Sequence, residues 1–180
     1  MVMGKRITTN LLIPILCWFL LISCEEQEPL YDLFPLKVGN EFNYTYSKDR
    51  YYPLIVNTRG TESWKVVLLT AQDGYFTYTV ERKIFLVTTL LSDTIDVTND
   101  TIFMEVKEKE STTLISFWGF EFKRYQDVPE IELKHEGEPT MPTESCVFKA
   151  DSGLVFYSYY HPPNQVINQT LRLDSVNFSQ

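Results

Sequence analysis

Aromatic and polar residues alternate along residues 42–46, and this two-residue period constrains the fold more than any other feature of the chain. Phe42, Tyr44 and Tyr46 would lie on one face of a β-strand, with the polar residues between them on the other face. No long stretch after residue 24 has apolar residues at the helical spacing of about 3.6 residues. The 12 phenylalanines and 11 tyrosines also favour strands. We therefore expect an all-β protein.

Turn-forming residues separate further runs of this kind. Asp73-Gly74 stands between strands expected over residues 63–70 and 75–85. An Asp-Gly pair in this setting is a strong signal for a tight hairpin, because a type I′ turn needs positive φ at both central residues. These two strands should therefore pair antiparallel.

More strands follow toward the C-terminus. They are expected over residues 86–97, 101–108, 114–125, 145–149, 154–160 and 166–178. Asn99-Asp100 is expected to form a turn, and Trp118 is expected on the core face of its strand, opposite Phe117. Prolines interrupt residues 129–144, which predicts an exposed loop with one short strand at 131–133. About eight or nine strands joined by short turns predict an antiparallel meander that forms a barrel or a strongly curved sheet.

The N-terminal residues have the organisation of an export signal. Lys5 and Arg6 precede an apolar stretch over residues 11–22, which Glu25 and Glu26 end. A membrane-spanning helix needs about 20 apolar residues, and this stretch is shorter. We therefore expect residues 1–23 to be a signal peptide that is removed.

The end of this signal resembles the lipobox of bacterial lipoproteins. Leu21-Ile22-Ser23-Cys24 has the apolar, tolerant, small and cysteine positions of that motif. The resemblance implies that the Cys24 thiol receives a diacylglyceryl group, so that acyl chains such as palmitate anchor the mature N-terminus. Each CH₂ buried in a membrane contributes about 0.8 kcal/mol. Cys24 is thus the expected lipidation site, and the membrane is an expected partner.

Two further segments resemble lipoproteins of Bacteroidota. The acidic run at residues 25–28 is similar to the signal that sends such lipoproteins to the cell surface, and Phe-Pro-Leu-Lys-Val-Gly-Asn at residues 34–40 resembles the opening of an uncharacterised outer-membrane lipoprotein family. The resemblance implies an anchor in the outer membrane of the cell envelope, and exposure at the cell surface or in the periplasm stays open. The expected organisation is a signal peptide over 1–23, an acidic tether over 24–33 and a single β-domain over 34–180.

The charge balance argues against nucleic acid as a partner. The chain has 16 basic and 24 acidic residues, and loss of Lys5 and Arg6 with the signal leaves 14 basic residues and a net charge of −10. Phosphate backbones are bound by clustered lysine and arginine, and a domain this acidic would be repelled by them.

No sequence motif identifies a catalysed reaction. His135 and His161 lack a neighbouring histidine or cysteine at the spacing of a zinc site. Ser152 fits a hairpin turn better than a nucleophile's position. Cys146 has no disulfide partner once Cys24 is acylated, and its apolar neighbours indicate a buried, inert thiol. We therefore expect no catalytic residue, metal or cofactor, and a non-enzymatic role is favoured over an enzymatic one.

Three short motifs resemble the acceptor for O-glycosylation in exported Bacteroidota proteins. The pattern is aspartate, then serine or threonine, then an aliphatic residue, and it occurs at Asp93-Thr94-Ile95, Asp100-Thr101-Ile102 and Asp174-Ser175-Val176. The resemblance implies that Thr94, Thr101 and Ser175 carry glycans.

The abundant aromatic residues admit two interpretations. Tyr51-Tyr52, Trp118 and the tyrosines at 157, 159 and 160 could line a groove for a carbohydrate or an acyl chain, or they could pack within the sheet, which is the favoured interpretation. The expected function is a lipid-anchored, non-catalytic module that binds an envelope protein or a glycan ligand. The alternatives are a half-barrel that carries lipids or lipoproteins and a glycan-directed hydrolase.

Overall fold

The structure is a computed structural model that describes residues 30–51, 54–109, 113–135, 142–161 and 167–179. Every regular element in these ranges is a β-strand, and none is a helix that could cross a membrane. The expected signal peptide and Cys24 lie outside the described residues. The strands are β1 (Tyr31–Asp32), β2 (Glu41–Arg50), β3 (Val56–Gln72), β4 (Tyr75–Leu90), β5 (Asp93–Lys109), β6 (Leu114–Phe117), β7 (Phe120–Lys123), β8 (Tyr125–Gln126), β9 (Glu130–His135), β10 (Thr143–Lys149), β11 (Gly153–His161) and β12 (Ile167–Asn177).

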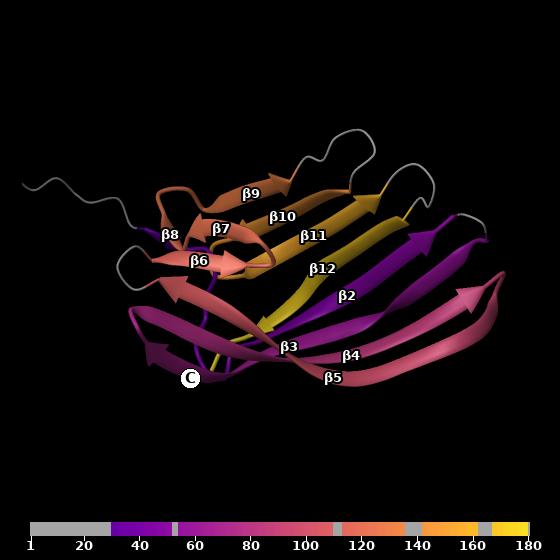
Figure 1. Ribbon diagram of the computed structural model, residues 1–180, viewed down its shortest axis with the longest axis horizontal. Helices are drawn as coiled ribbons and strands as arrows, with labels where there is room; N and C mark the ends of the chain where they lie inside the picture. Colours follow the sequence, from indigo (N-terminus) through magenta and orange to yellow (C-terminus); the bar gives the residue numbers. More distant parts are fainter. Residues whose placement is uncertain (1–29, 52–53, 110–112, 136–141, 162–166, 180) are drawn as a thin grey trace, which may run out of the picture.

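Ten of these strands form one antiparallel sheet, in the order β7-β6-β5-β4-β3-β2-β12-β11-β10-β9. β1 and β8 pair in a separate two-stranded ribbon. The large sheet curls until β6 and β7 lie over β10 and β11 (Figure 1). Ring contacts join the two ends of the sheet, with centroid distances of 4.3 Å for Phe120 and His135 and 4.4 Å for Phe122 and Phe148. The predicted antiparallel all-β fold is confirmed, in the form of a nearly closed barrel.

Some predicted boundaries were wrong. Asn99-Asp100 is not a turn but lies within β5, paired with β4, and the chain reverses earlier, at Leu91-Ser92 with φ angles of 49° and 86°. Pairing with the neighbouring strand outweighs the turn preference of these two polar residues. The strand expected at 131–133 extends over Glu130–His135, because β9 pairs with β10 along its whole length.

Residues 114–125 are not one strand but the hairpin of β6 and β7. The chain turns at Trp118-Gly119, where φ is 45° and 79°. Phe117, which we expected to face away from the core, is only 2% exposed. Bulky residues rarely adopt positive φ, so the sequence predicted a continuous strand here and not a turn at Trp118.

Residues 30–40 close one end of the barrel, which we call the tether end. Leu33, Phe34 and Leu36 are buried there, and the Phe34 ring packs against Phe148 with centroids 5.4 Å apart. The C-terminus lies at the same end (Figure 1). We call the opposite end, where β2 and β11 finish and β10 and β12 begin, the distal end.

The barrel wall is incomplete toward the distal end. β6 and β7 have four residues each, whereas β3, β4 and β5 have 16 or 17. The short hairpin therefore stops partway along β5, and beyond it the described residues place no further strand beside β5 (Figure 1). This difference in strand length creates the opening in which the candidate site lies.

Candidate functional site

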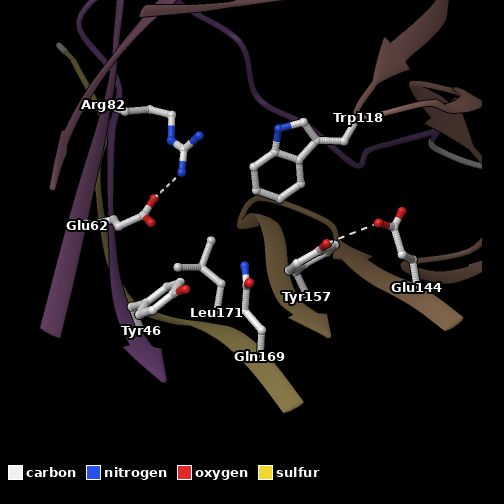
Figure 2. A pocket seen from close by; sticks show the side chains of 8 residues that line it. All are labelled: Tyr46, Glu62, Arg82, Trp118, Glu144, Tyr157, Gln169 and Leu171. Atoms are coloured by element: carbon white, nitrogen blue, oxygen red, sulfur yellow. Dashed lines mark hydrogen bonds and ion pairs between the residues drawn. The ribbon is translucent and has the colours of Figure 1, made fainter. Parts of the chain in front are cut away.

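A cavity of about 360 Å³ lies on the inner face of the sheet, beside the β6–β7 turn. Its walls come from β2, β3, β4, β10, β11 and β12 together with the turn (Figure 2). Glu144 and Gln169 stand near the distal starts of β10 and β12, so the cavity lies on the distal side of the packed core. The lining residues are Tyr46, Glu62, Arg82, Trp118, Glu144, Tyr157, Gln169 and Leu171.

A buried ion pair forms one wall of the cavity. Arg82 donates to Oε2 of Glu62 at 2.6 Å, and the Trp64 indole N–H donates to the same oxygen at 2.8 Å. The side chains of Arg82 and Glu62 are 15% and 4% exposed. Because the two charges offset each other and Trp64 adds a hydrogen bond, the pair is a neutral, fixed polar surface.

The register of β3 and β4 places this pair inside the barrel. Trp64 faces the core and pairs with Arg82, and Glu62 lies two residues earlier on the same face of β3. The Arg82 guanidinium lies over the rings of Trp64 and Trp118, at 5.1 and 5.4 Å from their centroids. Its Nε is buried without a hydrogen-bond partner, which leaves one donor of this group unsatisfied.

Trp118 forms the adjoining wall, and its backbone is strained. Its φ of 45° is unfavourable for a bulky residue, and packing holds it there. The indole contacts Trp64 of β3 and Tyr157 of β11, with centroid distances of 5.2 and 4.9 Å. Trp118 therefore bridges strands from both sides of the barrel, and backbone strain of this kind is often found at functional sites.

Tyrosine hydroxyls and a second carboxylate complete the polar lining. Tyr157 donates to Oε1 of Glu144 at 3.4 Å, and burial followed by the charge of Glu144 raises the pKa of Tyr157. Burial and the nearby Glu62 raise the pKa of Tyr46 to about 12. Both hydroxyls thus stay protonated at physiological pH. The cavity combines aromatic faces with hydrogen-bond donors and acceptors.

Both carboxylates of the lining are engaged by other side chains, and Glu144 accepts from Tyr157. Glu62 is occupied by Arg82 and Trp64, so it is poorly placed to act as an acid or a base. The eight lining residues contain no serine, cysteine or histidine that could form a nucleophile and base pair. Within the described ranges, no three histidine, cysteine, aspartate or glutamate side chains gather as metal ligands would.

A second large cavity, of about 430 Å³, lies at the tether end. Its charged walls are Asp32 and Arg124, which form an ion pair at 2.8 Å, together with Lys37 and Asp151. We favour the cavity beside Trp118 as the functional site, because it alone of these two joins a strained aromatic residue to buried polar groups.

The structure brings together only part of the predicted aromatic groove. Trp118 and Tyr157 line the cavity, and they also pack against core residues, so both interpretations of them hold. Tyr51 and Tyr160 are exposed, and Tyr159 stacks near His161. Tyr52 lies outside the described residues.

The other predicted residues occupy positions that fit their expected environment. Thr94 and Thr101 on β5 and Ser175 on β12 are all exposed, as glycan acceptors must be. Cys146 is fully buried, and burial raises its pKa to about 12, which keeps the thiol protonated. Ser152 lies in the turn between β10 and β11.

Sequence reasoning missed four lining residues that supply most of the polar chemistry. The position of Glu62 could have been predicted, because it lies two residues from Trp64 and therefore shares the inward face of the strand. Arg82, Glu144 and Gln169 likewise share the inward faces of their strands with Val80, Cys146 and Leu171, but only the strand register places all four residues around one space.

Comparison with known proteins finds neither a matching family model nor a matching curated protein. Two crystal structures align with the chain. One is a provisionally assigned exported protein with a YmcC-like fold from Bacteroides fragilis, at 6% identity and a TM-score of 0.39, covering 83% of this chain and 100% of that one. The other is a provisionally assigned lipoprotein from Parabacteroides distasonis, at 8% identity and a TM-score of 0.33, covering 84% of this chain and 100% of that one.

Proposed function

We propose that the protein is a lipoprotein of the bacterial cell envelope, anchored through Cys24, whose β-domain binds a glycan in the cavity beside Trp118 without catalysing a reaction. The observation that carries this proposal is Trp118, held at positive φ beside the Glu62–Arg82 pair, with both lining the same cavity. A polyhydroxylated ring suits such a site, because it has an apolar face for aromatic contact and hydroxyls that both donate and accept hydrogen bonds.

The lining disfavours the alternative of a lipid carrier. An acyl chain in this cavity would offer no hydrogen bond to Glu144 or to the unsatisfied Nε of Arg82, which is costly. The barrel interior near the tether end is already filled by aromatic side chains such as Phe34 and Phe148. These features favour a polar ligand.

The tether length keeps the domain close to the proposed anchor. Residues 25–29 separate the proposed anchor from Leu30, so the tether end can lie at most roughly 20 Å from the lipidated cysteine. The cavity lies on the distal side of the core, so a membrane at the tether end would leave it accessible. We extend the proposal to an anchor in the outer membrane, with glycans on Thr94, Thr101 and Ser175.

Ligand binding is tested with Trp118→Ala. We expect the wild-type domain to bind defined members of a printed array of bacterial, plant and mammalian glycans, and Trp118→Ala to bind the same glycans at least about tenfold more weakly, because the aromatic contact is lost. Calorimetry on the best array ligand gives the affinities. Phe103→Ala is the matched control, since Phe103 is exposed on β5 and does not line the cavity. Absence of any bound glycan, or equal binding by Trp118→Ala, would reject the proposal.

The anchor is tested with Cys24→Ala in cells fed radioactive palmitate. The wild-type protein should carry the label and fractionate with membranes, whereas Cys24→Ala should carry none, because the acylated thiol is gone. Cys146→Ala serves as the control, since that buried thiol should not affect labelling. Equal labelling of wild type and Cys24→Ala would exclude this anchor.

A further inference from the structure

β5 presents a long free edge of the sheet. β4 pairs with β5 along its whole length, whereas β6 pairs only with Lys107, Glu108 and Lys109. From Asp93 to Val106, the described structure has no strand on the other side of β5 (Figure 1). Such an edge carries a row of unpaired backbone N–H and C=O groups that can template another strand.

One backbone N–H on this edge donates a hydrogen bond to a side chain. The carboxylate of Asp100 accepts a hydrogen bond from the N–H of Thr101 at 2.7 Å, so this N–H is not used in pairing with β4. Amides of alternate residues point to the same side of a strand, so the amides of Asn99 and Phe103 point to the free edge as well. The edge is therefore available to an added strand after a local displacement of Asp100.

The usual protections of an edge are mostly missing here. Residues 93–106 contain no proline and no lysine, and their apolar side chains are well exposed, with Phe103 at 63%, Ile95 at 54% and Val97 at 53%. Exposed apolar groups along a free edge are typical of a surface that a partner covers.

The charge of the edge indicates the chemistry of that partner. Asp93, Asp96, Asp100 and Glu105 lie in residues 93–106, which contain no basic residue. A second copy of β5 would bring the same carboxylates together, which is unfavourable. A strand that carries lysine or arginine would be attracted.

We propose that the β5 edge over residues 93–106, in molecules that carry no glycan on Thr94 and Thr101, is a docking site that takes up an extended, basic segment of a partner protein as an additional strand. Backbone hydrogen bonds would supply affinity, and the carboxylates and apolar groups along the edge would supply selectivity. This site is separate from the cavity, because none of the residues that line the cavity belongs to β5.

The test uses the full acylated protein in zwitterionic detergent and two synthetic nonapeptides of alternating lysine and valine. One peptide has normal amides, and its twin is N-methylated at every second amide, which keeps the charge but blocks one hydrogen-bonding edge. We expect the normal peptide to bind and to protect residues 93–106 from hydrogen exchange, and the twin to bind at least about tenfold more weakly. Failure of the normal peptide to bind, or equal binding of the twin, would overturn the proposal.

Variants of the protein give a second, independent measurement. Proline is tolerated on an edge where the N–H faces solvent, so Thr101→Pro should keep the fold and weaken peptide binding about tenfold, whereas Thr101→Ala retains the amide and should bind like wild type. Equal affinity of the folded proline and alanine variants would contradict the proposal. If Thr101→Pro does not fold, the comparison of the normal and N-methylated peptides still tests the proposal. Dimerisation of the wild-type protein through β5 would also refute the assignment to a basic partner.

Discussion

Arg124→Met is expected to lower the free energy of unfolding by about 3–5 kcal/mol, because it leaves a buried carboxylate without its counter-charge. Arg124 donates to both carboxylate oxygens of Asp32, at 2.8 and 2.9 Å, and to Glu108 at 3.0 Å. The side chains of Arg124 and Glu108 are 10% and 6% exposed. Burial alone would lower the pKa of Arg124, but its bonds to Asp32 and the two carboxylate charges raise it overall, so the group stays charged.

This network also attaches the N-terminal segment to the barrel. Asp32 belongs to β1, which enters from the tether, and Glu108 belongs to β5. Tyr78 donates to Glu108 at 2.9 Å, and burial together with this bond raises the pKa of Tyr78 to about 12. Loss of Arg124 should therefore loosen the tether end as well as destabilise the whole domain.

Urea denaturation of Arg124→Met, Glu108→Gln and the double variant measures the effect. The double variant should lose less stability than the sum of the single variants, because the uncompensated charge at position 108 is gone. Lys107→Met is the control, since the Lys107–Glu105 pair is at the surface, with side chains 56% and 62% exposed, and should change stability little. A loss below about 1 kcal/mol in Arg124→Met would show that the network does not stabilise the fold as described.

Gly60→Ala is expected to destabilise the protein by about 2–3 kcal/mol, although the same change in an ordinary strand stabilises by about 0.5–1 kcal/mol. A Cβ at residue 60 would lie 1.9 Å from the carbonyl oxygen of Phe85 and 2.9 Å from the Cα of Leu86. Both atoms belong to the backbone of β4, so the two strands would have to separate locally.

The measurement is again equilibrium unfolding, with Thr61→Ala as the control. Thr61 is exposed on the next position of β3, and its substitution should change stability by less than about 0.5 kcal/mol. Because Gly60 lies two residues before Glu62, the variant should also weaken ligand binding in the cavity. Wild-type stability in Gly60→Ala would contradict the close approach of β3 and β4.

Local sequence patterns predicted the elements where one face of a strand is buried or a turn has its preferred residues. Phe42, Tyr44 and Tyr46 are buried, as their alternation predicts, because a residue's side in a strand depends only on its position in the strand. Asp73-Gly74 turns with positive φ at both residues, 53° and 77°, as expected for that pair.

The same patterns failed where contacts from other strands outweighed local preference. Asn99 and Asp100 are drawn into β5 by pairing with β4, and Trp118 is held in a turn by rings that are distant in sequence. Neither outcome follows from the residues themselves, because the deciding contacts come from segments elsewhere in the chain.

The sequence by itself determined the all-β class, the inward positions of the aromatic residues and the expectation of an anchor at Cys24, since each of these depends on neighbouring residues. Only the tertiary structure decided that the sheet nearly closes, that β5 keeps a free edge and that Glu62, Arg82, Trp118 and Glu144 surround one cavity. The physical reason is that register and strand length set these features jointly over the whole sheet. A shift of one residue in the pairing would turn those side chains to the other face.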